Sequence, residues 1–139
     1  MNISSTGYTG LAFPMRLSNK GGLKLTTTSP TDFTHIEESI RQIVGTAIGE
    51  RPMELYFGSN VSYHIFDPTD DSAYNLLRHE IVEALEKFEP RIQVESNDIK
   101  MQDSLDDLTG ENLLHITIAY RVISYNKTGT VDVQIGGNN

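Results

Sequence analysis

Two stretches of the chain repeat apolar residues at helical spacing. The first lies between residues 31 and 49, and the second lies between residues 72 and 88. The repeated residues are Ile36, Ile40, Ile43, Val44 and Ala47 in the first stretch, and Leu77, Ile81, Ala84, Leu85 and Phe88 in the second. This pattern predicts two amphipathic helices that each bury one face.

The first helix has candidate signals at both ends. Asp32 or Thr34 could accept the first free amide protons as the N-cap, and Thr34 with Glu37 has the spacing of a capping box. Gly49 fits the C′ position just beyond the last turn. These residues predict a helix that begins near residue 34 and stops before Gly49.

The second helix is expected to start after Asp70 or Asp71 and to end sharply. Pro90 disfavours helical backbone angles at Glu89, so the helix should stop there and Arg91 should open an extended segment. The carbonyl end of a helix carries about half a negative charge, so an exposed carboxylate there costs about 0.3–1 kcal/mol. Glu89 therefore needs an explanation other than helix stability.

Apolar and polar residues alternate with period two in the last third of the chain. Residues 114–122 alternate strictly, and residues 131–135 do so after a turn with Gly129 near its tip. Shorter segments at residues 91–94 and 99–101 predict a further strand. We therefore expect an α+β fold with two main helices packed on a small, mostly antiparallel sheet with a long C-terminal β-hairpin.

The remaining segments are less regular. Residues 13–17 and 23–25 alternate and predict a short hairpin, but Pro14 cannot donate to a ladder, which favours a sheet edge or an irregular arm. Residues 51–66 are heavily apolar without a sustained period, so they should pack on the core or on a partner. We expect one domain over residues 1–139, with an arm (1–30), a helical part (31–90) and a β region (91–139).

Composition excludes several classes of function. The 139 residues include no cysteine, which removes disulfides and thiol nucleophiles. The net charge of −8 disfavours binding to phosphate backbones, so nucleic acid is not an expected partner. The N-terminus lacks the features of a signal peptide, and no stretch is long and apolar enough to span a bilayer. We expect a soluble chain without a membrane partner.

The acidic residues offer only a weak case for catalysis. Glu80, Glu83, Glu86 and Glu89 lie three apart on the second predicted helix, where they form a ridge and not a cleft. The histidines lack metal-ligand spacing, so no metal or other cofactor is expected. A hydrolase that uses Glu86 or Glu89 with a second acid such as Asp67 is the enzymatic alternative, since glycoside hydrolysis needs two carboxylates.

Three features favour protein binding instead. The long hairpin leaves a strand edge that either another strand of the chain or a partner strand must cover. The apolar loop offers a second surface. At the end of the second helix, Pro90 separates Glu89 from Arg91, so that the guanidinium could be held in one orientation for bidentate contacts.

The order of these motifs resembles the baseplate wedge, or sheath-initiator, family of contractile phage tails and phage-like injection systems. This family includes proteins labelled lysozyme-like and a relative in the type VI secretion baseplate. The similar segments are GLAFP (10–14), IEESIRQIVGTAIGER (36–51), MELYFGSNV (53–61), IFDP (65–68), ALEKFEPRIQV (84–94) and the HITIAYRV strand (115–122). Phe88 stands where the family often has tryptophan, and Pro52 and Leu55 depart from the usual pattern.

The resemblance implies a non-enzymatic baseplate subunit that docks onto the helical core bundle of the wedge and pairs with strands of the first sheath ring. The implied partner-binding residues are Glu89, Pro90, Arg91, Glu50, Arg51, Phe57 and Gly58, with Tyr120, Val122, Val131, Val133 and Ile135 in the hairpin. It also implies several copies around the tail axis, the tube or hub periphery as a further neighbour, and assembly in the bacterial cytoplasm. A stand-alone oligomeric adaptor is a third alternative.

Overall fold

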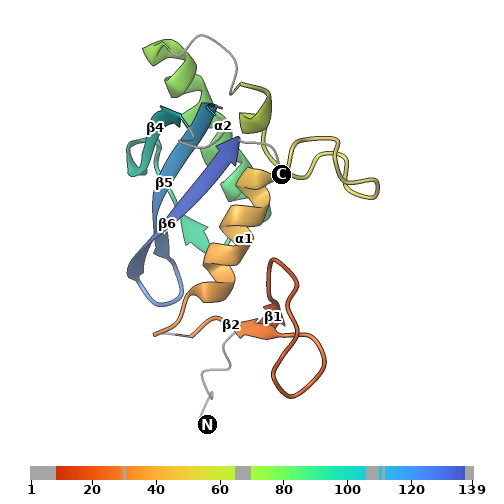
Figure 1. Cartoon of the computed structure of the whole chain (residues 1–139). Helices are drawn as coiled ribbons and strands as arrows, with labels where there is room; N and C mark the ends of the chain where they lie inside the picture. Colours follow the sequence, from red (N-terminus) through yellow and green to blue (C-terminus); the bar gives the residue numbers. More distant parts are fainter. Residues whose placement is uncertain (1–8, 30, 65–69, 106–109, 111, 137–139) are drawn as a thin grey trace.

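The computed structural model describes residues 9–29, 31–64, 70–105, 110 and 112–136. Two helices pack against an antiparallel sheet, and a two-stranded arm extends from one end of the molecule (Figure 1). The elements are β1 (Thr9–Leu11), β2 (Leu25–Thr27), α1 (Thr34–Gly45), η1 (Val61–Tyr63), α2 (Asp71–Phe88), β3 (Ile92–Gln93), η2 (Ser96–Asp98), β4 (Ile99–Leu105), β5 (Asn112–Val122) and β6 (Lys127–Gly136). The predicted α+β class is confirmed.

Helix α1 buries the predicted stripe, but its ends differ from the prediction. Phe33 occupies the N-cap position, and the Asp32 carboxylate accepts hydrogen bonds from the backbone N–H and the hydroxyl of Thr34. Because Thr34 is already the first helical residue, the capping box with Glu37 does not form. The helix ends at Gly45, so Gly49, at φ +88°, lies in the following turn and is not the stop.

Helix α2 matches its prediction closely. Asp70 is the N-cap, and its carboxylate accepts a 2.7 Å hydrogen bond from the backbone N–H of Ala73. The helix ends at Phe88, where the proline two residues later predicts a stop. The buried residues are Leu77, Ile81, Ala84 and Leu85, and Phe88 packs partly buried against the same core.

Strand β5 is the centre of the sheet. β6 pairs antiparallel with it from Leu113 opposite Gly136 to Val122 opposite Lys127. β4 and β3 also pair antiparallel with β5, and they share its other side because β6 occupies the first. The expected continuation from β3 into β4 therefore exists in space, although η2 interrupts it in the chain.

The hairpin turn comes earlier in the chain than the position of Gly129 suggests. Residues 123–126 make the turn, with Asn126 at φ 48°, and Gly129 already lies in β6 opposite Tyr120. A Cβ atom built on Gly129 would lie 2.5 Å from the Tyr120 ring. Glycine is therefore required here because the aromatic ring covers the backbone of the neighbouring strand.

The N-terminal arm (residues 9–27) pairs in a different register from the predicted hairpin. β1 and β2 pair at Thr9–Leu11 and Leu25–Thr27, so Leu25 is the only one of the alternating residues 13–17 and 23–25 that lies in these strands. Within the predicted hairpin only Leu17 and Leu23 form a bridge. Pro14 supplies no N–H for a ladder, which agrees with the irregular arm expected from its position.

Candidate docking surfaces

The Glu89–Arg91 corner (residues 89–91) directly follows α2. The guanidinium of Arg91 donates from Nε to Oε1 and from Nη2 to Oε2 of Glu89, both at 2.5 Å. The Glu89 side chain is 3% exposed and the Arg91 side chain is 25% exposed, while Pro90 is at the surface. Glu89 thus faces the interior of its own subunit, and Arg91 and Pro90 are the accessible part of the corner.

The ionisation of Glu89 is set by two opposing effects. Burial alone would raise the pKa of its carboxyl group, but hydrogen bonds from Arg91 and Ser39 and the positive charge of Arg91 hold the pKa below its usual value. Glu89 is therefore a charged, internally paired carboxylate. This pairing offsets the unfavourable end of the helix dipole and orients the guanidinium.

The apolar loop (residues 51–57) is joined to this corner through two aromatic rings. The Arg51 guanidinium lies 3.9 Å from the ring centroid of Phe57, and the Phe57 and Phe88 centroids are 4.9 Å apart. Phe88 is the last residue of α2, directly before Glu89. Two segments that are separate in sequence, the apolar loop and residues 88–91, therefore meet at the end of α2.

Gly58 and Ser59 fix the far end of the apolar loop against α1. Gly58 is buried at φ +115°, and a Cβ atom there would lie 2.2 Å from the carbonyl oxygen of Thr46. Ser59 donates from its hydroxyl to the carbonyl of Val44 at 2.8 Å. Glu50, at the start of the segment, is exposed and accepts a hydrogen bond from the backbone N–H of Ala47 at 3.0 Å.

Most of the apolar loop does not pack on the core of this subunit. Met53 is 95% exposed, Tyr56 is 78% exposed and Leu55 is 56% exposed, whereas Phe57 is half-buried. These three side chains therefore do not follow the first alternative expected for this segment, which is packing on the core. Exposed apolar residues of this size are typical of protein-interaction sites.

The C-terminal hairpin offers backbone atoms at its edge, as expected for strand pairing, while the side chains of the five implied binding residues face inward. The side chains of Tyr120, Val122, Val131, Val133 and Ile135 are all buried in the subunit's own core. Among the strands that the structure describes, β6 pairs only with β5, so its outer edge has no strand beside it. Any strand that joined this edge would pair with backbone N–H and C=O groups.

Arg41 identifies the outward-facing backbone groups of β6. Its Nε donates to the carbonyl oxygen of Asp132 at 3.4 Å from α1, so this carbonyl points away from β5. In an antiparallel strand, alternate residues direct their backbone groups to the same side. Thr130 and Gln134 therefore direct their N–H and C=O groups outward as Asp132 does. No local sequence pattern predicts this contact, because Arg41 and Asp132 are 91 residues apart.

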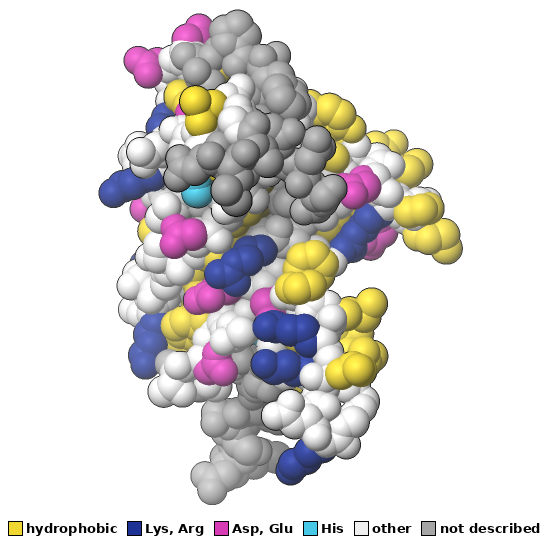
Figure 2. Space-filling model, in the orientation of Figure 1, with side chains coloured by type: hydrophobic (Ala, Val, Ile, Leu, Met, Phe, Trp, Pro, Cys, Tyr) yellow, Lys and Arg dark blue, Asp and Glu magenta, His cyan; other side chains and the backbone are white. Residues whose placement is uncertain are grey.

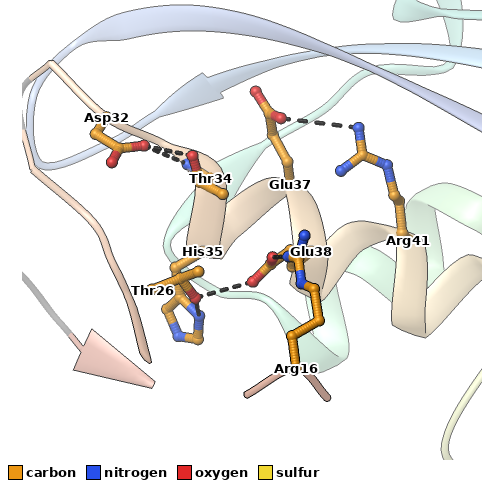
Figure 3. Close-up of polar contacts among 8 residues, drawn as sticks. All are labelled: Arg16, Thr26, Asp32, Thr34, His35, Glu37, Glu38 and Arg41. Carbon is orange, nitrogen blue, oxygen red and sulfur yellow. Dashed lines mark hydrogen bonds and ion pairs between the residues drawn. The ribbon is translucent and has the colours of Figure 1, made fainter. Parts of the chain in front are cut away.

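A polar cluster joins the arm to α1 (Figure 3). The buried carboxylate of Glu38 accepts hydrogen bonds from Arg16 at 2.5 Å and from the Thr26 hydroxyl at 2.9 Å. The Thr26 hydroxyl lies 3.2 Å from Nδ1 of His35. Sequence analysis missed this cluster, although a charged residue beside the apolar stripe of α1 is a signal of a buried polar contact.

Tyr120 ties the hairpin to the same helix. Its hydroxyl donates to Glu37 Oε1 at 3.4 Å, and Glu37 also lies 3.8 Å from Arg41. Burial raises the pKa of Tyr120, and the negative charge of Glu37 raises it further. These contacts hold α1 against β5 and β6 together with the apolar core.

The enzymatic alternative finds little support in the acidic residues. A catalytic acid needs a raised pKa, whereas the pKa of Glu89 is lowered. Glu86 is exposed on α2, and Asp67 lies outside the described residues.

Within the described part of the chain, no group of three or more His, Asp or Glu side chains could hold a metal ion. Neither described helix is long and apolar enough to cross a bilayer.

The exposed apolar side chains and the uncovered edge of β6 are features of proteins that bind other proteins. The model of the baseplate wedge protein gp25 family matches residues 31–127, and the chain belongs to this family. Its role is therefore structural, as a component of the baseplate of a contractile tail or injection particle. The matched residues include both helices and the Glu89–Arg91 corner but exclude the arm.

Two solved structures are similar to the chain. A Geobacter sulfurreducens protein with the provisional name tail lysozyme shares 33% identity, with a TM-score of 0.58 over 76% of this chain and 90% of that one. A chain of the anti-feeding prophage baseplate shares 22% identity, with a TM-score of 0.61 over 96% of this chain and 89% of that one. The second likeness concerns the fold alone. Among curated proteins, none matches the chain.

Proposed function

We propose that this protein links the core bundle of the baseplate wedge to the first sheath ring and templates sheath assembly. The observation that carries the proposal is the convergence of Arg51, Phe57 and Phe88 beside the Glu89–Arg91 corner. This end of α2 combines an oriented guanidinium with exposed apolar side chains. Such a combination suits a helical partner that buries apolar residues around a bidentate acceptor.

The wedge contact is made by Arg91 and Pro90 with the apolar loop. Glu89 holds the guanidinium in place from inside the subunit, so its role is positioning. Arg91 then presents its exposed face to a carboxylate or to the C-terminal carbonyls of a helix in the core bundle. The sheath contact is made separately by the outer edge of β6, where Thr130, Asp132 and Gln134 direct backbone groups outward.

The wedge contact is tested with Glu89→Gln/Arg91→Gln, which removes both charges together and leaves no unpaired buried charge. Folding is first checked by circular dichroism and thermal unfolding. We expect a folded subunit that fails to enter the baseplate in cells that express the remaining tail genes. Arg121→Gln, which removes an exposed arginine from β5, is the matched control and should assemble. Normal particles from the folded double variant would reject the wedge contact.

The sheath contact needs a subtler change than deletion. Removing β6 would also remove Val131, Val133 and Ile135 from the core. Thr130→Pro/Gln134→Pro instead removes two outward N–H groups and leaves the bonds to β5 in place, because proline is tolerated where the N–H faces away from the sheet. Thr130→Val/Gln134→Val keeps both N–H groups and is the control.

The two docking steps predict distinct defects by electron microscopy. The proline variant should give complete baseplates without a sheath, and the valine control should give full-length tails. Full-length sheaths on proline-variant baseplates would contradict strand templating, even if the wedge contact is correct. Assembly in the bacterial cytoplasm is part of the proposal. Genes for sheath and tube proteins next to the gene for this protein would distinguish a tail component from a stand-alone adaptor.

A further inference from the structure

The arm exposes an unusual amount of apolar surface. Six of its apolar side chains are between 41% and 77% exposed, and they are Leu11, Phe13, Met15, Leu17, Leu23 and Leu25. Figure 2 shows hydrophobic side chains beside basic ones at this end of the molecule. An apolar surface with a polar rim is typical of a site that another protein covers. The arm lies outside the residues matched by the family model.

The arm also differs in charge from the rest of the chain. Residues 1–31 carry Arg16, Lys20 and Lys24 and no acidic residue. Because the whole chain carries −8, residues 32–139 carry −11. The surface that complements the arm is therefore acidic and partly apolar, and the body of this same chain has that character.

A pocket on the body has the matching shape and chemistry. It lies between α2 and the segment before η1, and it holds about 180 Å³. Its lining includes the rings of Tyr56 and Phe88 and the carboxylates of Glu80 and Glu83, which outnumber the single base Lys87.

One carboxylate oxygen of this pocket lacks a donor. Oε2 of Glu80 is buried and has no hydrogen-bond partner within the described part of the chain. A buried carboxylate oxygen is strongly unfavourable without a donor, so native proteins usually supply one. A cationic group that reached this carboxylate from another molecule would supply a donor.

We propose that the arm of one copy docks on this pocket of a neighbouring copy. Lys20 lies at the tip of the arm, in a turn closed by the bonds Ser18 N–H to Gly22 C=O at 2.9 Å and Gly21 N–H to Ser18 C=O at 3.0 Å. Lys20 enters the pocket between the two aromatic rings and donates to Glu80. The apolar side chains of the arm pack around Tyr56 at the pocket, and Met53 and Leu55 remain exposed for the wedge contact.

This contact is heterologous, because the arm of one subunit meets a different surface on the next. Repetition of such a contact closes into a ring when the rotation allows it. The arm extends away from the helices and the sheet (Figure 1), so its tip is available to a second subunit. The contact involves neither the β6 edge nor Arg91, and it can be tested on the isolated chain.

Zero-length cross-linking with a carbodiimide tests the contact directly, because it joins an amine to a carboxylate that touches it. Equal amounts of unlabelled and nitrogen-isotope-labelled protein are mixed, cross-linked and digested. We expect Lys20–Glu80 peptides that combine one labelled and one unlabelled half. Peptides in which both halves always carry the same label, or no Lys20–Glu80 peptide at all, would overturn the proposal.

A charge exchange tests the same pair by sedimentation over a concentration series. Lys20→Glu and Glu80→Lys should each weaken self-association about tenfold or more, and the variant with both changes should recover most of it. Lys100→Glu on β4 and Glu86→Lys on α2 are the matched controls and should stay within about threefold of wild type. A chain that stays monomeric at every concentration overturns the proposal. A Glu80→Lys defect without a Lys20→Glu defect also overturns it, because the pocket would then take a cation from another protein.

Discussion

Arg91→Ala is the most direct test of the buried pair in the Glu89–Arg91 corner. The substitution removes two 2.5 Å hydrogen bonds from a carboxylate that is 3% exposed. Removing one partner of a buried ion pair costs about 3–5 kcal/mol, because the other charge is left uncompensated. A quarter of the Arg91 side chain is exposed, so we expect the lower end, about 3 kcal/mol. This is a large part of the roughly 5–15 kcal/mol that stabilises a domain.

A double-mutant cycle separates the pair from the packing of each side chain. Glu89→Gln removes the charge but keeps the shape of the side chain, so Glu89→Gln/Arg91→Ala contains no buried charge. We expect this double variant to be more stable than Arg91→Ala by at least about 1 kcal/mol. Urea unfolding followed by far-ultraviolet circular dichroism measures all four free energies of unfolding.

The pH dependence of the cycle has a definite sign. The folded-state pKa of Glu89 lies below its usual value of 4.5, so the unfolded state takes up a proton first as the pH falls. The stabilisation from the pair is therefore complete above about pH 4.5 and is lost as the pH falls through the lowered folded-state pKa. The advantage of wild type over Arg91→Ala should shrink in acid. Equal stabilities at neutral pH, or a double variant no better than Arg91→Ala, would refute the reasoning.

Four further substitutions, of which Gly45→Ala is a control, test packing and the contacts of α1. Gly129→Ala should destabilise by about 1–3 kcal/mol because its Cβ atom meets the Tyr120 ring, whereas Gly45→Ala, with nothing near its Cβ atom, should be neutral or slightly stabilising by thermal unfolding. Gly58→Ala should cost at least about 2 kcal/mol, since it adds backbone strain to a clash with Thr46, and an unchanged melting temperature would contradict the buried turn. Tyr120→Phe should lose about 0.5–1.5 kcal/mol at neutral pH. Because the folded-state pKa of Tyr120 is raised, wild type should lose stability above about pH 10, and Tyr120→Phe should lose less in an alkaline urea series.

The helices and the hairpin were predictable because their periodicity comes from burial on one face. Ile36, Ile40 and Ile43 repeat at helical spacing and all are buried, and the alternation of β5 has the same origin. Local sequence also predicted the stop at Glu89, since a proline restricts the residue before it whatever its surroundings. These signals involve neighbours in the chain.

The corrections concern positions that depend on distant residues. Whether Glu89 faces a partner or the interior depends on Ser39 in α1, which no local pattern around residue 89 contains. The family resemblance implied that five hairpin residues take part in docking. The alternation that predicts a strand for these residues also places their side chains in the core. The register of the arm depends on which residues can donate a backbone N–H group to the neighbouring strand. Pro14 has no N–H group, and β1 and β2 pair at Thr9–Leu11 and Leu25–Thr27, away from it.

The buried carboxylate of Glu38 limits how this protein can be shortened. The two side chains that donate to it, Arg16 and Thr26, come from the arm, whereas the family match begins only at residue 31. A chain trimmed to the matched region would lose both donors to this side chain, and loss of solubility in such a fragment would reflect the loss of these contacts. Point changes at the arm tip leave this anchor intact, which makes them the cleaner way to ask what the arm does.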